Sequence, residues 1–559
     1  MPAFFHAVAI DYDGTLTERP RPSDDALAAV RLVRESGRKC LLVTGRILSE
    51  LRADFPEVDA HFDAIVAENG AVLSSGRGVP RPLAPPVSPE LEAALRARLV
   101  PLRRGNVLLA TESGYGAVVG EEIGRLGLEV QVTRNRGALM VLPAGVTKGS
   151  GLLGALGVLG LSRHSTVAIG DAENDHSLLD ACEIGVAVAN AIEPLRAHAD
   201  IVLTEPSGRG VAAFLRRLLT EGIADVEPRR WQVVLGSYDD GTPASVPASH
   251  VNIGIYGRSG SGKSYLAGLL AEQLIAMAYT ICVLDLEGDQ LGLATLHGAV
   301  AAGGAEPLPP PEQIVRLLRH GLASVVIDLS LSCGDTKRSY SAALLEQLYD
   351  SRHQSGIPHW IVIDEAHVAM PAGFEGRWYH DATQTGLCLV TYMPEQLCRA
   401  TRAQAEVVVR LDADVGPTLR RDGWAAARRF RPAERATHHV RHWHKYTEGL
   451  LPGDRRFFFR DSRALTGRSA ASVPEFLAEV RRARPEALRH HAAHRDFSRW
   501  LGDLLRETQL SLAVAQIEKS LASAHATDVD RLRARLVGVI EAFFSGVGDG
   551  APPSRSPLR

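Results

Sequence analysis

The segment Ile10–Thr17 (IDYDGTLT) constrains the fold of this chain most, because an apolar run ends there in two closely spaced carboxylates. The apolar residues between Phe4 and Ile10 predict a short buried strand. Asp11 and Asp13 project to the same side of such a strand, so their charges need a cation or a shared proton nearby. We therefore expect a divalent metal site here. The alternative is an Asp/Gly turn at a strand end, without chemistry.

Three later segments repeat this pattern of an apolar run that ends in polar or charged residues. They are Leu41–Arg46 (LLVTGR), Ala138–Leu142 followed by Thr147 and Lys148, and Val167–His176 (VAIGDAENDH). The helical segments between them suit right-handed βαβ crossovers, which bring the carboxyl ends of parallel strands to one sheet edge. The sequence thus predicts an α/β domain whose chemistry lies at that edge.

The four motifs, in this order, resemble those of the haloacid dehalogenase (HAD) superfamily of phosphatases. Glu68–Ala71 (ENGA) resembles the branch with an inserted α/β cap, type IIB, which includes phosphoglycolate phosphatase-like members. The resemblance covers about residues 1–222. It implies a Rossmann-like three-layer domain with a small cap at about residues 83–143.

The resemblance also implies roles for individual residues. Asp11 would be the nucleophile that forms an aspartyl phosphate, and Asp13 the general acid and base. Thr44 and Lys148 would hold the phosphoryl oxygens. Mg²⁺ would be bound by Asp11, Asp13 through its backbone carbonyl, and Asp171, with support from Asp175 and Asn174. Gly45, Arg46 and Asn174 would face the substrate. The chemistry agrees, because a carboxylate attacks an anionic phosphate only if positive charges cancel the repulsion.

The proposed cap begins after a proline-dense hinge, Val79–Glu90. We expect a helix, a strand at Val107–Ala110, a helix near Gly120–Leu128 and a strand at Gly137–Leu142. A small cap implies a small phosphate ester. An insert that serves stability alone is the alternative.

Length and composition set the outer limits. A chain of 559 residues is too long for one core, so we expect two to four domains. The formal charge of −3 says nothing about a nucleic-acid partner. The six cysteines show no disulfide-like spacing, and Cys40, Cys182 and Cys282 lie in apolar runs. With no apolar stretch of ~18 residues and no signal sequence at the N-terminus, we expect a cytoplasmic protein without a membrane partner.

A second phosphate motif lies far downstream. Gly257–Ser264 (GRSGSGKS) follows an apolar strand, Val251–Tyr256, and precedes a helix, Tyr265–Met277. This is the pattern of a P-loop. Gly257, Gly260 and Gly262 would let backbone amides approach the phosphates of ATP, Lys263 would meet the β and γ phosphates, and Ser264 would bind Mg²⁺.

His359–His367 (HWIVIDEAH) is the matching Walker B segment, in which Asp364 would organise the Mg²⁺ shell and Glu365 would polarise the attacking water. A glutamate here favours ATP hydrolysis over phosphoryl transfer to a substrate hydroxyl. Together with strands at Thr280–Leu286 and Leu387–Thr391, these motifs resemble the central ATPase domain of the HerA and FtsK class of DNA motors. The resemblance covers about residues 231–425 of an expected ATPase domain at 223–425.

The chain departs from that class in its sensor. Thr391–Pro394 (TYMP) stands where those motors carry Ser-Gln-Arg-Pro, with Gln384 or Gln396 as substitutes, and their N-terminal β-barrel is missing. Candidate arginine fingers are Arg410, Arg420 and Arg421. Because the class completes its site across a subunit boundary, we expect a homo-oligomer through this domain.

Residues 426–545 begin with a basic run at 428–460 and continue as helices. The run interleaves basic residues with aromatic ones: Arg428, Arg429, Arg431, Arg435, Arg441, Lys445, Arg455, Arg456, Arg460, His438, His439, His442, His444, Trp443, Tyr446 and Phe457–Phe459. Such a run suits DNA or RNA, and a solvated face is the alternative. We expect helices at Val473–Arg484, Pro485–His491, Phe497–Leu505 and Leu510–Phe544, and a disordered tail at 546–559.

Two classes of function remain. The first is a Mg²⁺-dependent phosphatase for a small ester, of the phosphoglycolate or sugar phosphate type, controlled by an ATP-hydrolysing module. The second is a nucleic-acid machine, in which a motor delivers a phosphorylated end to the phosphatase, or a polynucleotide kinase and phosphatase. The small cap and Glu365 favour the first.

Overall fold

The computed structural model describes residues 5–76, 78–135, 137–223, 226–258, 260–373, 377, 381, 384–412, 415–437, 456–460, 465–505 and 508–548. The chain divides into two compact units. One comprises Met1–Leu286 and Gln290–His439, and the other comprises Val440–Arg559 with Glu287–Asp289. The first unit contains both phosphate motifs.

Within the described residues, the first sheet has eight strands in the order β12-β11-β10-β1-β2-β3-β4-β5. They are β1 (Ala7–Asp11), β2 (Lys39–Val43), β3 (Ala64–Ala67), β4 (Val72–Ser74), β5 (Arg81–Pro82), β10 (Thr166–Gly170), β11 (Ile184–Ala187) and β12 (Ile201–Val202). The six strands from β12 to β3 run parallel. The parallel strands expected before the first, second and fourth motifs are therefore present as β1, β2 and β10, with their carboxyl ends at one edge. The expectation is wrong for the third motif, because the strand before Thr147 and Lys148 is β9 (Ala138–Pro143), which pairs antiparallel in the separate sheet of the insert.

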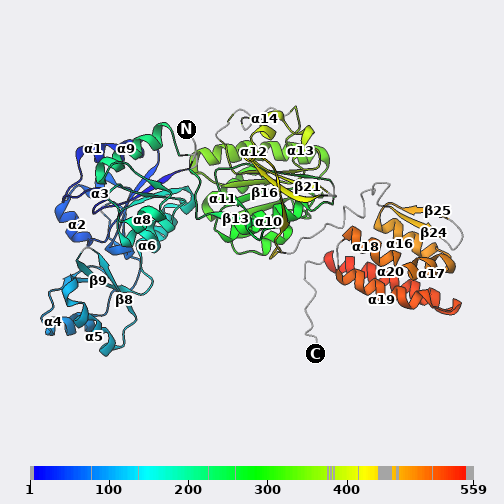
Figure 1. The fold of residues 1–559 in the computed structure, drawn as a ribbon, viewed down its shortest axis with the longest axis horizontal. Coiled ribbons are helices and arrows are strands. Elements are labelled where there is room, and N and C mark those ends of the chain that lie inside the picture. The colour runs from blue at the N-terminus through cyan, green and yellow to red at the C-terminus, as the bar shows by residue number, and fades with distance from the viewer. Residues whose placement is uncertain are drawn as a thin grey trace. The chain divides into compact units, whose positions relative to one another are not determined.

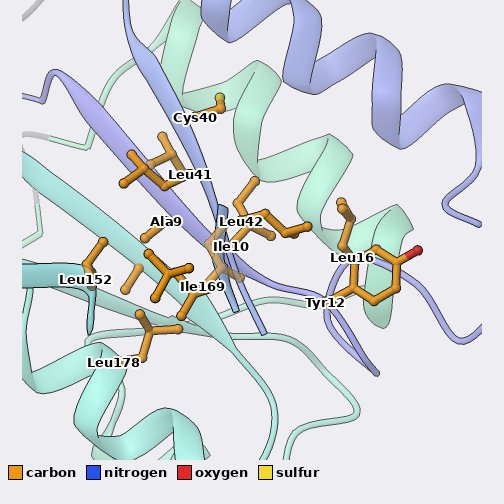
Figure 2. Close-up of a cluster of buried hydrophobic side chains, with 14 of the residues drawn as sticks. Ala9, Ile10, Tyr12, Leu16, Cys40, Leu41, Leu42, Leu152, Ile169 and Leu178 are labelled. Carbon is orange, nitrogen blue, oxygen red and sulfur yellow. The ribbon is translucent and has the colours of Figure 1, made fainter. Parts of the chain in front are cut away.

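Helices cover both faces of this sheet, which gives the expected three-layer α/β fold (Figure 1). They are α1 (Asp24–Glu35), α2 (Leu48–Asp54), α3 (Val58–His61), α6 (Lys148–Leu159), α7 (His176–Asp180), α8 (Glu193–His198) and α9 (Ser207–Thr220). Figure 2 shows Ala9 and Leu41 of the strands on the side of the sheet where Leu152 of α6 and Leu178 of α7 lie, whereas Ile10 and Leu42 lie toward the opposite side. Full burial of β1 and β10 explains why their sequences are continuous apolar runs.

The insert forms a four-stranded antiparallel sheet, ordered β6-β7-β9-β8, with two helices. Its elements are α4 (Pro89–Ala97), β6 (Arg103–Arg104), β7 (Leu109–Glu112), α5 (Gly116–Leu126), β8 (Val130–Asn135) and β9 (Ala138–Pro143). Strands β6 and β8 are not predicted from the sequence, because they lie at the two edges of the sheet and lack a buried apolar run.

The second sheet has eleven strands in the described residues, ordered β14-β13-β23-β22-β21-β15-β20-β19-β16-β18-β17. They are β13 (Gln232–Tyr238), β14 (Pro243–Pro247), β15 (Ile253–Gly257), β16 (Ile281–Asp285), β17 (Ala299–Gly303), β18 (Ser324–Asp328), β19 (Trp360–Ile363), β20 (Leu387–Thr391), β21 (Val407–Asp412), β22 (Gly416–Arg421) and β23 (Arg428–Pro432). The helices are α10 (Lys263–Ala276), α11 (Pro311–Gly321), α12 (Gly334–Ser355), α13 (Ala366–Ala369) and α14 (Arg399–Ala403).

The structure adds one strand to this region and corrects one boundary. The turn at Asp239–Gly241 joins β13 to β14, an edge strand whose terminal prolines hide it in the sequence. The expected domain boundary at 425 cuts the second sheet, since β23 pairs with β22 and β13. Arg428, Arg429 and Arg431 therefore belong to this sheet rather than to the C-terminal region.

The second unit is mainly helical, as expected, and also contains a β-hairpin. Its elements are β24 (Phe457–Arg460), β25 (Leu465–Ala470), α16 (Val473–Arg482), α17 (Pro485–His494), α18 (Asp496–Leu505), α19 (Thr508–Ala522) and α20 (Ala526–Gly548). The single helix expected over Leu510–Phe544 is interrupted at 523–525, where neither glycine nor proline marks a break. Helix α20 extends to Gly548, so the expected disordered tail cannot begin at 546.

Other expectations fall outside the described residues. His438, His439, Arg441, His442, Trp443, His444, Lys445, Tyr446, Arg455 and the tail from 549 are among them. Cys40, Cys182 and Cys282 are buried free thiols, as predicted. Among the described residues, no helix is long and apolar enough to cross a membrane.

Candidate active site

Three aspartates meet at the carboxyl edge of the first sheet. Asp11 ends β1, and Asp171 and Asp175 follow β10, which pairs directly with β1. Among the described residues, each of the three offers one oxygen within 4.8 Å of the others, and all three are buried. The side chain of Asp13 is not in this group, although the sequence placed it beside Asp11.

Lys148 lies between two of these carboxylates. Its Nζ is 2.6 Å from Asp11 Oδ1 and 2.7 Å from Asp175 Oδ1, and it is almost fully buried. Lys148 is the first residue of α6, whose N-cap is Thr147. The loop before β4 packs tightly against this helix start: Gly70 has φ +105°, and a Cβ there would lie 1.9 Å from the Thr147 carbonyl oxygen.

Burial and charge compete within this group. Burial raises the pKa of Asp11 well above its usual value, and the negative charges of Asp175 and Asp171 add to the rise, while Lys148 opposes it. Burial alone would lower the pKa of Lys148, but the charges of Asp11 and Asp175 outweigh it and raise that pKa. Three carboxylates and one ammonium thus leave an excess of negative charge in a buried site.

The donor set fits a hard divalent cation such as Mg²⁺, because all three groups offer carboxylate oxygens. Asp171 Oδ1 also accepts a hydrogen bond from Thr15 Oγ1 at 3.0 Å. Asp175 Oδ2 accepts from the backbone N–H groups of Asp171 and Ala172. Both Asp175 oxygens are therefore engaged, which suits a supporting role more than direct coordination.

Asp13 is instead held by Arg46. The guanidinium donates to both Asp13 oxygens, with Nε–Oδ2 at 2.9 Å and Nη2–Oδ1 at 2.7 Å, and its Nη1 lies 2.7 Å from Asp54. The side chain of Asp13 remains 41% exposed, so incoming substrate and water have access to it. Thr44 is buried, and its Oγ1 accepts from the Arg46 amide.

The cap closes over this edge through two contacts that the sequence analysis did not assign. Glu68 is fully buried, and its carboxylate accepts from the amides of Asn106, Val107 and Leu108 in the cap. Met140 of β9 lies over Gly45: a Cβ on Gly45 would be 3.8 Å from the Met140 sulfur and 3.8 Å from Asn174 Nδ2.

The P-loop follows β15 and leads into α10, as predicted. Gly260 and Gly262 have positive φ values of 75° and 100°. Lys263 is nearly buried, and its Nζ donates to the Arg258 carbonyl oxygen at 3.2 Å. Strand β20 lies between β15 and β19, so Thr391, Gly257 and Asp364 all lie at the same carboxyl edge.

The Walker B residues adopt an unusual local conformation. Asp364 is buried, and its Oδ1 accepts from the Glu365 amide at 3.0 Å, while Glu365 has φ +46°. His367 Nδ1 lies 3.4 Å from Glu365 Oε2 and 3.0 Å from Thr391 Oγ1. Of the two proposed sensor substitutes, Gln384 is buried against Asp381, and Gln396 is exposed.

The arginines proposed as fingers lie on neighbouring strands. Arg410 of β21 lies opposite Thr418 of β22, and Thr418 lies opposite Arg429 of β23, so these three side chains are on the same face of the sheet. Side chains two residues apart along a strand also share a face, which adds Arg420 and Arg431. Arg410, Arg420, Arg429 and Arg431 therefore lie on one face, and all four are exposed. Arg421 instead pairs with Glu227. We call these four residues the arginine face.

Comparison with known proteins agrees with the α/β fold of the N-terminal part. Residues 121–215 match the family of haloacid dehalogenase-like hydrolases, and residues 240–299 match the central domain of the helicase HerA. A phosphoglycolate phosphatase from Methanothermobacter thermautotrophicus is 34% identical over 219 residues, which are 38% of this chain and 98% of the relative. One from Methanopyrus kandleri is 34% identical over 233 residues, covering 38% of this chain and 97% of the relative.

A haloacid dehalogenase-like hydrolase of known structure from Bacteroides thetaiotaomicron is 22% identical, with a TM-score of 0.34, and covers 38% of this chain and 99% of that one. The chain belongs, through its N-terminal part, to the haloacid dehalogenase-like hydrolases.

Proposed function

We propose that the N-terminal part is a Mg²⁺-dependent phosphatase for a small phosphate monoester, and that the P-loop site binds and hydrolyses ATP. The observation that carries the first half is the buried group of Asp11, Lys148, Asp171 and Asp175. When bound, Mg²⁺ would supply positive charge to the phosphate and to the carboxylates.

In this mechanism, Asp11 attacks the phosphorus atom while Lys148 reduces the repulsion between the two anions. The leaving oxygen takes a proton from Asp13, and the phosphoryl group is then on Asp11. Asp13 next removes a proton from water, which attacks the aspartyl phosphate and releases phosphate. Arg46 holds Asp13 in the structure, so it orients the acid before substrate arrives.

The small cap favours a small substrate of the phosphoglycolate or sugar phosphate type. Met140 of the cap and Asn174 both lie beside Gly45, so the cap contributes a side chain next to the second motif. Both relatives described above are phosphoglycolate phosphatases, which favours a short phosphorylated acid.

A panel of phosphate monoesters, assayed for phosphate release with Mg²⁺ and with or without ATP and DNA, tests this proposal. We expect turnover of small esters and a loss of about 10⁴-fold or more in Asp11→Asn, which keeps the shape of the side chain. Ordinary turnover in Asp11→Asn would refute the aspartyl phosphate mechanism. Met140→Ala should raise kcat/KM for bulkier esters relative to phosphoglycolate.

The ATPase half is supported by the geometry of Lys263, Asp364 and Glu365 at one sheet edge. Lys263→Ala should lower ATP hydrolysis by about 10²-fold or more, because it removes a charge that would contact the transferred phosphate. Phosphatase turnover measured without nucleotide should stay unchanged in this variant. Unaltered ATP hydrolysis in Lys263→Ala would exclude the P-loop as the site.

The arginine face favours a second candidate function, nucleic-acid processing. Four exposed guanidiniums on adjacent strands suit a phosphate backbone. The double variant Arg420→Gln/Arg429→Gln should bind a labelled single-stranded oligonucleotide more weakly, with a smaller salt dependence. Equal binding by this variant and the wild type would remove that candidate.

A further inference from the structure

A buried polar cluster joins the aspartate-site part of the first unit to the P-loop part. It consists of His164, Glu183, Ser249 and Tyr279, which we call the junction cluster. The Glu183 carboxylate is fully buried and accepts from the hydroxyl groups of Ser249 and Tyr279, with the Tyr279 oxygen 2.9 Å from Oε2. His164 Nδ1 lies 2.6 Å from the same carboxylate.

The junction cluster contains a buried ion pair. His164 Nε2 lies 2.8 Å from the Met277 carbonyl oxygen, so both ring nitrogens face acceptors. A histidine that donates from both nitrogens is positively charged, which matches the carboxylate beside it. Burial alone would raise the pKa of Glu183, but the hydrogen bond and the charge of His164 outweigh it and lower that pKa. The His164 ring also stacks on Tyr279, with centroids 3.6 Å apart.

On the phosphatase side, the junction cluster lies at the start of two strands that lead to the aspartates. His164 precedes β10, which ends one residue before Asp171, and Glu183 directly precedes β11. The Glu183 amide donates a hydrogen bond to the carbonyl oxygen of Thr166, which is the first residue of β10. A shift at the cluster therefore acts on the strand that positions Asp171 and Asp175.

On the P-loop side, two elements connect the junction cluster with the nucleotide motif. Helix α10 begins at Lys263 and ends just before Met277, a span of about 20 Å for 14 residues. Strand β16 follows Tyr279 and ends at Asp285, which accepts from the Gln290 amide, and Gln290 Nε2 donates to the Ser264 carbonyl oxygen. The P-loop and the junction cluster thus lie at opposite ends of the same helix and strand.

The P-loop end of this connection must change when nucleotide binds. Lys263 donates to the carbonyl oxygen of Arg258 in its own loop, and a bound phosphate would take that ammonium. Resting on the proposed function, we infer that nucleotide at the P-loop regulates the phosphatase site through the junction cluster. The two sites then share a coupling free energy, which acts equally in both directions.

The experiment measures inhibition of p-nitrophenyl phosphate hydrolysis by vanadate, with and without a non-hydrolysable ATP analogue and Mg²⁺, in the full-length protein. We expect the analogue to change the vanadate inhibition constant by about 5-fold or more. In Glu183→Gln, this change should vanish while turnover without nucleotide and binding of the analogue persist. The matched control Glu227→Gln, which alters a linker carboxylate paired with Arg421, should keep the full effect.

Tyr279→Phe provides a milder variant, because it removes one hydrogen bond to Glu183 and keeps the ring stacked on His164. It should reduce the nucleotide effect even if Glu183→Gln does not fold. The inference is overturned if both sites bind their ligands in the wild type without affecting each other, or if Tyr279→Phe and folded Glu183→Gln respond as the wild type does. Failure of the wild type to bind the analogue or to hydrolyse the ester would instead refute the proposed function.

Discussion

Glu68 shows how one carboxylate positions a whole insert. It lies in the core loop after β3, with φ +55°, yet its oxygens accept from three consecutive amides of the cap. The next residue, Asn69, accepts from Asn174 Nδ2 at 3.0 Å. The loop thus connects the cap to the aspartate site, and no local sequence signal predicts this because the partners are distant in the chain.

Replacing Glu68 by Gln should loosen the cap. The new NH₂ group would face backbone N–H donors, which costs about 1 to 3 kcal/mol for unpaired buried groups. We expect a lower free energy of unfolding in urea and a higher KM for the small ester. Glu112→Gln, at an exposed position of the cap, should change the free energy of unfolding by less than about 0.5 kcal/mol. Equal unfolding curves for the two variants would contradict this role.

At the scale of elements, burial decides what the sequence could predict. The central strands β1, β10 and β20 are fully buried, and their apolar runs predict all three, although β1 begins at Ala7, three residues after the expected start at Phe4. Edge strands such as β8 and β14 carry no such run and were missed. Asp11 and Asp171 could be predicted to lie together because parallel strands place their carboxyl ends at one edge. The argument does not apply to Lys148, which starts α6 after a strand of the antiparallel sheet of the insert; its place beside the aspartates was implied by the family resemblance alone. Three other features could not be predicted from the sequence, because they depend on how loops and inserts pack. They are the Asp13–Arg46 pair, the position of Met140 over Gly45, and the junction cluster.

The junction cluster also predicts acid sensitivity. The lowered pKa of Glu183 means that its ionised form stabilises the folded protein above the usual value of 4.5. This contribution is lost as pH falls through the lower pKa of the folded state. Between neutral pH and about pH 3, the free energy of unfolding should therefore fall less in Glu183→Gln than in the wild type, measured by urea titration. A parallel pH dependence in the two proteins would contradict the buried ion pair.

At the scale of the whole molecule, the remaining expectation is self-assembly through the P-loop part. Arg410 and Arg420 are exposed on the arginine face, and we propose them as the arginines that would contact the nucleotide of a neighbouring subunit. An arginine supplied by a neighbouring subunit can raise the rate of nucleotide hydrolysis by about 10³- to 10⁵-fold. Because more subunits assemble at higher protein concentration, ATP turnover per subunit should rise with concentration. Light scattering with a non-hydrolysable ATP analogue should show assembly. A monomer with full, concentration-independent turnover would exclude it.

The most direct test of the central claim is to trap the phosphoryl group on the enzyme. The full-length protein is mixed with Mg²⁺ and a phosphate ester labelled on phosphorus, quenched in acid during the first turnover, digested and mapped by mass spectrometry. We expect the label on the peptide that contains Asp11, with loss of the label in hydroxylamine and no label in Asp11→Asn. Label on a different residue, or labelling of Asp11→Asn equal to that of the wild type, would contradict an aspartyl phosphate on Asp11.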